Sequence, residues 1–396
     1  MGRARSRRRA RRFEDNAVKI LFCSPAPLTK SLGAAKVVVE LAEEMRELGW
    51  ECDLVSIKEL ADQSGQSMSE SLRHYLQEHA DEYDVVDYDH EYLPYARSKF
   101  SPRPLFVARS VLLVHHLETI PIPTGRGFRS TLGTLVKGRA RKIARQERVQ
   151  RAQKTVAEAD LVNVSNHEDK TELIRRGIAP DKIVVIPYGI SRARRPLFDQ
   201  VSSAPPPAPV VAFVGTFDYR KGAREFPQIA QAIVDAVPNA RFRLLGAKGL
   251  YKTEAEILGR FPRSLTPKIE VVLNFRPEEL PGLLSSCSVG IFPSYMEGMP
   301  FGVLEMLAAS VPVIAYDAPG PPMLLPAEYL VPRGDVQAMS GKIVSLLGDI
   351  GYLLAVRRWA QERSKEYEWA AIAATSSETY QGCIKRQDRV PSSLSR

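Results

Sequence analysis

Two glutamates, Glu297 and Glu305, lie in the stretch FPSYMEGMPFGVLEMLA (residues 292–308). An apolar run of strand length ends at residue 292, a Gly/Pro turn follows, and apolar residues then recur as in a helix. Glu297 is therefore expected in the loop at the carboxyl end of a strand, and Glu305 within the next helix. Ligands of open α/β sheets bind at that edge, where helix N-terminal amides suit a diphosphate and carboxylates accept hydrogen bonds from sugar hydroxyls.

The alternative interpretation is a solvated loop acid and a solvated helix acid, and two glutamates alone favour it. However, Glu305 precedes Met-Leu-Ala-Ala, so its helix is apolar. An acid in such a helix is costly unless it has a partner. The composition of this helix therefore favours a functional role.

Several further motifs follow one another in a characteristic order. They are KILFCSPAP with Gly33, ADLVNVSNHEDKTELIRRGI followed by DKIVVIPYGI, FVGTFDYRKG, and residues 275–320 with the two glutamates. Together they resemble the retaining GT-B glycosyltransferases, especially glycosyltransferase family four, whose signature is E-x7-E. The resemblance covers nearly the whole chain after residue 17. It implies an α/β fold of the GT-B type, with two Rossmann-like, doubly wound domains facing a cleft.

The same resemblance assigns roles around a nucleotide-diphosphate sugar, UDP- or GDP-linked. Glu297 would lie beside the donor sugar and Glu305 on the nucleotide ribose. The family's phosphate-binding pattern G-R-x4-K-G is matched by residues 215–222, with Lys221 in place, Thr216 at the arginine position, and Arg220 as a candidate substitute. The expected donor-binding set is Gly33, Gly215, Thr216, Arg220, Lys221, Glu297, Gly298, Met299, Phe301, Gly302, Val303 and Glu305.

Gly33 matches the second glycine of the family's N-terminal pair, which approaches the donor phosphates, while Leu32 replaces the first. A lone glycine before a helix is equally consistent with an ordinary turn.

The catalytic set expected by this resemblance is Glu297, Lys221, His90 and Arg109, and the acceptor-binding set is His90, His115 and His116. A family histidine after the strand at 105–108 has no direct counterpart here, because Ser110 or Val111 aligns with it. For each of these histidines, a structural role is the alternative. Arg109 is equally consistent with contact to an anion and with a structural role.

Asp87-Tyr88-Asp89 spells D-x-D, which binds a divalent metal in a different glycosyltransferase fold. Metal ligation needs such carboxylates beside the phosphates. Here the phosphates are expected on helix N-termini and Lys221. We therefore interpret the motif as coincidental and expect no metal, and no cofactor besides the nucleotide-sugar co-substrate.

Strands are expected at 18–23, 52–55, 84–88, 105–108, 161–164 and 183–186, then at 210–214, 241–245, 269–272, 289–292 and 311–316. Helices are expected at 34–48, 129–158, 222–236, 277–286, 301–309, 336–348 and 352–381. The run SSAPPPAP near residue 205 predicts a stiff linker. We expect a basic disordered tail (1–16), an acceptor domain (17–200), a linker (201–209), a donor domain (210–365), a helix returning to the first domain (366–385) and a disordered tail (386–396).

The chain has 396 residues and a net charge of +9. Residues 1–12 carry +7 and residues 121–154 carry +9, so the remainder is net −7. The basic segment 121–154 is interpreted either as a solvated helix face or as a surface for anionic membranes or an acidic acceptor. No apolar run reaches the roughly 18 residues of a membrane span, and no secretory signal is expected.

The four cysteines, Cys23, Cys52, Cys287 and Cys383, are scattered without metal-ligand spacing. We therefore expect a cytoplasmic protein without structural zinc. If the basic segment 121–154 is a surface for anionic membranes, the protein would also lie peripherally at the inner face of the membrane.

The resemblance thus implies a hexosyltransferase-type enzyme of glycan or cell-envelope biosynthesis, with retention of configuration. Two alternatives stay open: a nucleotide-sugar epimerase on the same fold, and a degenerate donor-binding subunit. No specific nucleic-acid partner is expected from the arginine-rich tail, because no base-reading module accompanies it.

Overall fold

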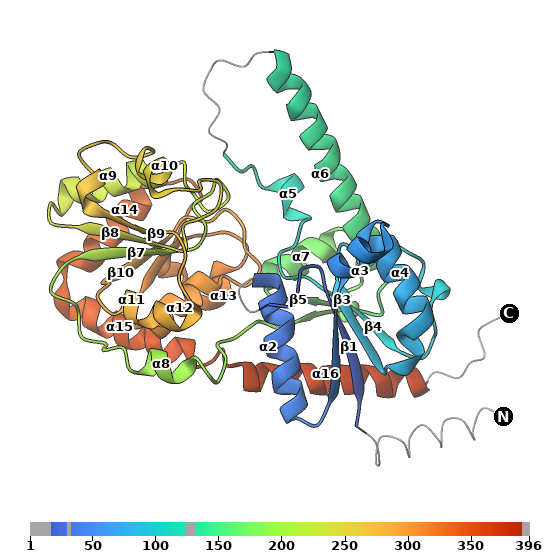
Figure 1. Cartoon of the computed structure of the whole chain (residues 1–396). Helices are drawn as coiled ribbons and strands as arrows, with labels where there is room; N and C mark the ends of the chain where they lie inside the picture. Colours follow the sequence, from blue (N-terminus) through green and yellow to red (C-terminus); the bar gives the residue numbers. More distant parts are fainter. Residues whose placement is uncertain (1–16, 30–32, 124–131, 390–396) are drawn as a thin grey trace, which may run out of the picture.

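The computed structural model describes residues 17–29, 33–123 and 132–389. The expectations for residues 1–16 and 390–396 lie outside these ranges. The described chain forms two six-stranded sheets, ordered β2-β1-β3-β4-β5-β6 and β12-β11-β10-β7-β8-β9. Neighbouring strands pair in parallel in both sheets. We call β1 to β6 with their helices the first unit, and β7 to β12 with theirs the second unit (Figure 1).

The strands of the first unit are β1 (Lys19–Ser24), β2 (Glu51–Ser56), β3 (Val85–Asp89), β4 (Leu105–Arg109), β5 (Leu161–Val164) and β6 (Ile183–Val185). Its helices are α2 (Gly33–Glu47), α3 (Ile57–Ser64), α4 (Met68–His79), α5 (His116–Thr119), α6 (Leu132–Glu158) and α7 (His167–Arg175). Short 3-10 helices are η1 (Ala80–Glu82), η2 (Arg97–Lys99) and η3 (Pro180–Lys182).

The second unit contains β7 (Val210–Val214), β8 (Arg241–Leu245), β9 (Ile269–Val272), β10 (Val289–Phe292), β11 (Val313–Tyr316) and β12 (Leu330–Val331). Its helices are α9 (Phe226–Ala236), α10 (Glu254–Leu258), α11 (Leu280–Leu284), α12 (Phe301–Ala308), α13 (Pro321–Leu324), α14 (Val336–Gly348) and α15 (Ile350–Ser364), with η4 (Thr266–Lys268), η5 (Pro277–Glu279) and η6 (Ala327–Tyr329). The connection from the first unit carries α8 (Arg195–Asp199), and the described chain ends with α16 (Trp369–Arg389).

The central strands form as their composition dictates. β10 and the first four residues of β4 are apolar, and both strands are buried along their whole length, as expected for parallel strands covered by helices on both faces. The predicted strands 210–214, 241–245, 269–272 and 289–292 agree with β7 to β10 residue by residue.

Two expectations for helices need correction. The helical stretch 352–381 is two helices, α15 and α16, interrupted where Glu368 forms a bridge with Ile190. Residues 386–389, expected in a disordered C-terminal tail, instead belong to α16, which extends to Arg389. The interruption is the point at which the chain leaves the second unit.

Helix α16 packs on the first unit, although it follows the second unit in the chain. It contacts α2 and β4, and Figure 1 shows it running along the first unit. The Trp369 indole donates to Glu40 Oε2 at 2.7 Å, and the Trp50 indole donates to Ser377 Oγ at 2.9 Å. These buried contacts make α16 part of the first unit's core.

Helix α6 projects away from the rest of the molecule (Figure 1). Its 27 residues correspond to a length of about 40 Å. The C-terminal half is anchored by Val149, Ala152 and Val156, which are buried. Among the described residues, no single helix is both long and apolar enough to cross a membrane; only α14 and α15 taken together, across a bend of 106°, reach that length and apolarity.

Candidate active site

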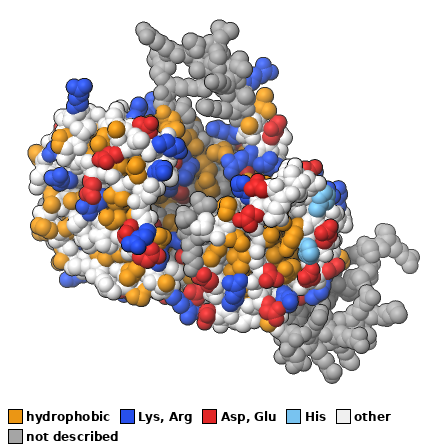
Figure 2. Space-filling model, viewed as in Figure 1, with side chains coloured by type: hydrophobic (Ala, Val, Ile, Leu, Met, Phe, Trp, Pro, Cys, Tyr) orange, Lys and Arg blue, Asp and Glu red, His pale blue; other side chains and the backbone are white. Residues whose placement is uncertain are grey.

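A cavity of about 380 Å³ lies where the carboxyl ends of strands from the two sheets face each other. The first unit lines it with Pro25, Asp89, His90, Glu91, Tyr92, Val111, Leu112 and Arg148, and the second unit with Arg220, Glu297, Gly298, Met299 and Phe301. Figure 2 shows the groove between the units, with Lys and Arg side chains on both walls. Both sheets therefore present their ligand-binding edges to one space.

Glu297 lies in the loop between β10 and α12 and is held by two cations. Its Oε1 is 2.6 Å from Arg220 Nη1 and 2.7 Å from Lys221 Nζ, and Ser294 Oγ donates to the same oxygen. Burial alone would raise the pKa of Glu297, but Arg220 and Lys221 outweigh it and lower that pKa. The structure thus brings three of the expected donor residues together around one ionised carboxylate.

The turn after β7 shapes this cluster. Thr216, at the position of the family's arginine, donates from Oγ1 to Asp218 Oδ2 at 2.6 Å. Gly215 precedes it at the end of β7. Thr216 therefore supplies no positive charge, whereas Arg220 places its guanidinium on Glu297. Burial lowers the pKa of Lys221, with Glu297 opposing the shift.

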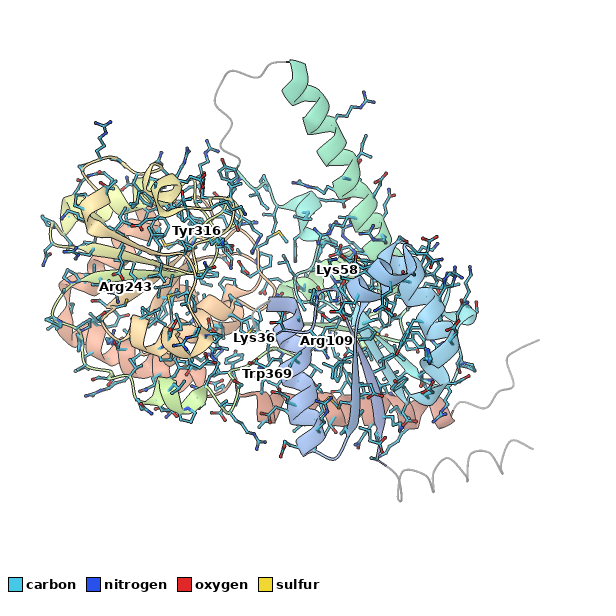
Figure 3. The ribbon with its side chains drawn as sticks, viewed as in Figure 1. Lys36, Lys58, Arg109, Arg243, Tyr316 and Trp369 are labelled. Atoms are coloured by element: carbon cyan, nitrogen blue, oxygen red, sulfur yellow. The ribbon has the colours of Figure 1, made fainter. Side chains whose placement is uncertain are left out.

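Glu305, within α12, is also buried and doubly paired. Its Oε1 lies 2.8 Å from Arg194 Nη1 and 3.6 Å from Lys36 Nζ. Burial would raise the pKa of Glu305, but Arg194 and Lys36 lower it. Lys36 belongs to α2, which begins at Gly33, and Figure 3 labels it on the side of α2 toward the second unit. The sequence analysis missed both cations, because they lie more than 100 positions from Glu305.

The remaining donor candidates divide into two groups. Met299 and Phe301 line the cavity, and Lys36 Nζ lies 5.0 Å from the centre of the Phe301 ring. Gly302 and Val303 are buried in α12 and do not line the cavity. A Cβ at Gly302 would lie 2.5 Å from Val214 O, so glycine lets α12 approach β7.

Gly298 is a point of close approach between the two units. A Cβ at this position would lie 1.9 Å from Val111 O, which belongs to the first unit. No side chain can be accommodated at that distance without moving the backbone. Glycine at position 298 therefore allows the donor loop to touch the opposite wall of the cavity.

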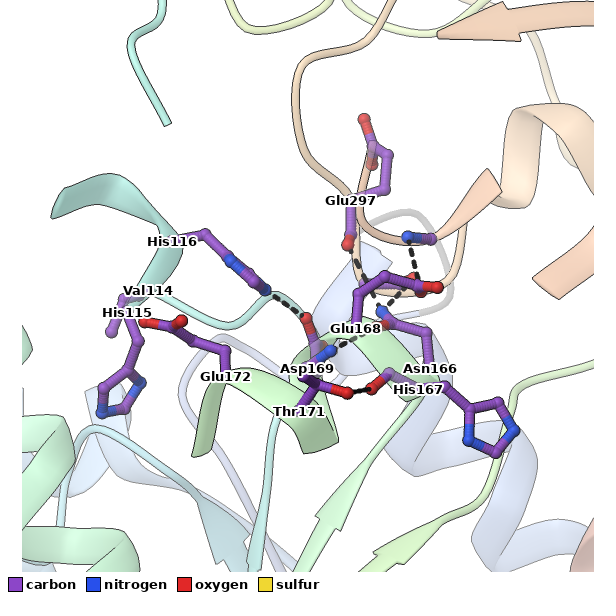
Figure 4. A network of polar contacts seen from close by, with 12 residues as sticks. Val114, His115, His116, Asn166, His167, Glu168, Asp169, Thr171, Glu172 and Glu297 are labelled. Carbon is purple, nitrogen blue, oxygen red and sulfur yellow. Dashed lines mark hydrogen bonds and ion pairs between the residues drawn. The ribbon is translucent and has the colours of Figure 1, made fainter. Parts of the chain in front are cut away.

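The three histidines occupy different environments. His90 lines the cavity, and burial lowers its pKa to about 3, so its ring is neutral near pH 7. His115 is buried away from the cavity lining, and burial likewise lowers its pKa to about 3. His116 Nε2 contacts Asp169 Oδ1, in the first turn of α7, at 2.8 Å (Figure 4). Of the three acceptor candidates, only His90 reaches the cavity.

Arg109 and the D-x-D motif are explained by an internal ion pair. Arg109 donates from Nε and Nη2 to the two oxygens of Asp87, at 3.0 and 2.7 Å, and Nη2 lies 2.8 Å from the Tyr380 hydroxyl. All three side chains are buried and none lines the cavity. The structure therefore places Arg109 in the core of the first unit, rather than at the cavity where an anion would bind.

Asp89 faces the cavity in a different setting from Asp87. Ligand atoms of Asp89, His90 and Glu91 lie within 4.8 Å of one another, the spacing of a possible cation site. However, Arg148 Nη2 already donates to Glu91 Oε1 at 2.6 Å. Burial and the neighbouring Glu91 raise the pKa of Asp89 to about 7. Asp89 was named from the sequence as part of the D-x-D motif beside His90, whereas Arg148 was not expected at this wall of the cavity.

The comparisons with known proteins agree with this architecture. Residues 208–349 match the family described as "Glycosyl transferases group 1". The chain is 28% identical over 193 residues to the sulfoquinovosyl transferase SQD2 of Arabidopsis thaliana, covering 47% of this chain and 36% of that protein. It is 27% identical over 265 residues to a D-inositol 3-phosphate glycosyltransferase of Corynebacterium glutamicum (strain R), covering 60% of each. The chain thus spans less than two thirds of the length of these relatives.

Solved structures match over almost the whole chain. Sucrose-phosphate synthase from Thermosynechococcus elongatus superposes with a TM-score of 0.69 at 19% identity, covering 93% of this chain and 100% of that one. Anabaena Alr3699/HepE in complex with UDP and glucose superposes with a TM-score of 0.61 at 16% identity, covering 92% and 99%. The fold is that of the GT-B glycosyltransferases, which confirms the predicted fold class.

Proposed function

We propose that this chain is a glycosyltransferase that moves a sugar from a nucleotide-diphosphate sugar to an acceptor hydroxyl. The observation that carries the proposal is the buried carboxylate of Glu297, held by Arg220 and Lys221 at the wall of the cavity. This cluster lies within the residues that match the group 1 glycosyl transferases. Relatives that carry glycosyltransferase names support the same reaction class.

The second unit would bind the donor. Lys221, Arg220 and the amides at the start of α12 would stabilise the negative charge that develops on the departing diphosphate. Glu305 would accept hydrogen bonds from the nucleotide ribose once Arg194 and Lys36 move aside. Closure of the two units around the sugar would exclude water that could hydrolyse the donor.

The proposed stereochemical course is retention. No protein nucleophile is needed in this scheme, because the bond to the diphosphate breaks as the acceptor oxygen attacks the anomeric carbon from the same side. The departing diphosphate oxygen then takes the proton of the acceptor hydroxyl. Analysis of the product anomer by NMR tests this part of the proposal.

The donor is proposed to be UDP- or GDP-linked, and the complex of Anabaena HepE with UDP and glucose makes UDP the first choice. We propose that transfer does not depend on a metal, since Lys221 and Arg220 supply positive charge at the expected phosphate site. Activity should then survive excess EDTA. A complete loss that Mg²⁺ or Mn²⁺ reverses would instead implicate Asp89 and Glu91.

The first unit is proposed to bind the acceptor, and α6 to attract an anionic surface. Arg139, Lys142 and Arg145 are exposed on this helix. Each cation near an anionic membrane contributes about 1 kcal/mol, so three give reversible, salt-sensitive docking at the cytoplasmic face. Co-sedimentation with phosphatidylglycerol vesicles at low and high salt tests this. If replacing all three residues by Gln leaves vesicle binding unchanged, α6 is a solvated helix and not the membrane-binding surface.

Two alternatives make different predictions. A nucleotide-sugar epimerase would release no nucleotide, and the relatives named above give this alternative no support. A degenerate donor-binding subunit was suggested by Thr216, but Arg220 provides a cation beside Glu297.

The deciding experiment incubates the protein with UDP- and GDP-sugars and measures nucleotide-diphosphate release with and without acceptors. D-inositol 3-phosphate belongs among these acceptors, because relatives are named for it. Acceptor-dependent release supports the transferase, whereas a thermal shift without any release supports the binding subunit.

A further inference from the structure

We propose that Asn166 is a positioning residue that fixes the Glu297 loop from the opposite unit. The inference rests on the proposed function of Glu297 at the donor sugar. Asn166 follows β5 in the first unit and is fully buried. Its Nδ2 donates to Gly298 O at 2.9 Å and lies 3.5 Å from Glu297 O (Figure 4). One side chain of the first unit therefore holds two consecutive carbonyls of the donor loop.

The other end of the same amide caps α7. Asn166 Oδ1 accepts a hydrogen bond from the Asp169 N–H at 2.7 Å, as an N-cap residue does. The oxygen must face that N–H, so the amino group must face the two carbonyls. The two ends of the amide are therefore not interchangeable, and each can be removed without the other.

Asn166 is itself attached to a rigid support. The Asp169 carboxylate is buried and accepts from His116 Nε2 at 2.8 Å, which ties the first turn of α7 to α5. On the far side of the loop, the Glu297 N–H donates to Pro319 O at 2.9 Å. The backbone of residues 297–298 is thus held between α7 of one unit and residue 319 of the other.

The absence of a side chain at Gly298 permits this contact, because it lets the Glu297 loop come close to the first unit. Gly298 lies against Val111 O and Ser165 Oγ, and a Cβ there would be 3.0 Å from that hydroxyl. Only in this close arrangement can Asn166 reach the Gly298 carbonyl. Asn166 thereby couples closure of the units to the direction in which the Glu297 carboxylate points, and a small error in such positioning lowers turnover steeply.

The test separates the two ends of the amide. Asn166→Asp keeps an oxygen that can cap α7 but has no amide N–H to donate to the loop. Asn166→Ser keeps a capping hydroxyl on a shorter side chain that lacks the Nδ2 amide. Asn166→Ala removes both ends of the amide. Ser67→Ala is the matched control, because Ser67 caps α4 on the surface of the same unit, accepting from the Glu70 N–H at 3.3 Å. Each variant is assayed for kcat and KM, for inhibition by UDP, and for hydrogen–deuterium exchange.

Asn166→Asp and Asn166→Ser should exchange faster at residues 294–303 but not in α7. Their kcat should fall by about tenfold or more, while UDP inhibition stays within about threefold, because one weak contact near the sugar barely alters nucleotide binding. Asn166→Ala should also expose α7, and Ser67→Ala should leave residues 294–303 unchanged.

The proposal would be overturned if hydrogen–deuterium exchange at residues 294–303 in Asn166→Asp and Asn166→Ser were the same as in the wild type. An unchanged kcat in these two variants would overturn it as well. The exchange measurement needs no turnover. If no donor is turned over by the wild-type chain but the loop still loses protection in Asn166→Ser, the proposed function fails and the contact by Asn166 stands.

Discussion

Lys36 Nζ lies 3.6 Å from the Glu305 carboxylate, so the first turns of α2 in one unit reach α12 in the other. Arg194 approaches the same oxygen more closely, at 2.8 Å. Both cations are largely screened from water, which strengthens their attraction to the acid. Glu305 is thus paired with two cations at the place where ribose hydroxyls are proposed to bind.

The two glutamates should fail in different ways when they are replaced. Glu297→Ala should lower turnover by at least about tenfold with little change in UDP affinity, because Glu297 is proposed to act at the sugar. Glu305→Ala should mainly weaken UDP binding. Steady-state kinetics and calorimetric titration with UDP measure the two effects, and a double variant with normal turnover and affinity would refute the site.

Gly298→Ala should force the units apart, because the new Cβ would meet Val111 O at 1.9 Å. We expect turnover to fall by about tenfold or more while the second unit stays folded. Gly341→Ala is the matched control, since its Cβ would meet no atom within 4 Å in the middle of α14. That change should be neutral or stabilising by up to about 1 kcal/mol. Equal kinetics for both variants would argue against close contact in the active state.

Arg109→Met should destabilise the chain rather than abolish chemistry directly. It leaves the Asp87 carboxylate buried without its cation, which costs about 3–5 kcal/mol. Adding Asp87→Asn should restore part of the loss. Arg276→Ala, which breaks an exposed pair with Glu279, should cost less than about 1 kcal/mol. Urea unfolding compares the variants; a stable but inactive Arg109→Met would return this arginine to the active site.

Asp89→Asn should change the pH dependence of stability. Burial and Glu91 raise the pKa of Asp89 to about 7 from an ordinary value of 3.8, so between these values the folded chain binds the proton more tightly than the unfolded chain. Stability contributed by the protonated form is therefore lost as the pH rises through about 7. Asparagine imitates that form, so the variant should unfold at a higher temperature than wild type at pH 8 and at a similar temperature near pH 4.

The control for this experiment is Asp62→Asn on α3, since Asp62 is exposed and pairs with the equally exposed Lys58. Its melting temperature should follow that of the wild type at each pH. A wild-type advantage over Asp89→Asn at pH 8 would show that the Asp89 carboxylate is stabilised by Arg148 and Arg151 more than it is penalised by burial.

The positions of most strands and of the donor-side loop were predictable, because they depend on local features. Apolar runs between helical segments locate β7 to β10, and Glu297 with Lys221 follows from spacing and resemblance. The helices α3 and α4 were not predicted, although Ser67 and Glu70 form a capping box that marks the start of α4. That signal was present in the sequence and was overlooked.

The partners of the site residues could not be predicted in the same way. Arg194, Lys36 and Asn166 contact the two glutamates from distant parts of the chain. The residues around each of them in the sequence do not indicate these contacts. Arg109 pairs with Asp87 because β3 and β4 are adjacent and parallel, with Asp87 opposite Val107. From the sequence alone, the same arginine at a strand end is equally suited to bind an anion.

The position of α16 has a consequence for biosynthesis. Tyr380 donates to Asp87 Oδ2 at 2.7 Å, so the last described helix completes the core of the half that is translated first. A nascent chain lacking residues 369–389 would leave Trp50 and Glu40 without the partners they have in the finished protein. The first unit can therefore mature only after residues 369–389 have left the ribosome, whereas the second unit can fold earlier. The first unit is therefore synthesised before the second unit, but its core is completed after it.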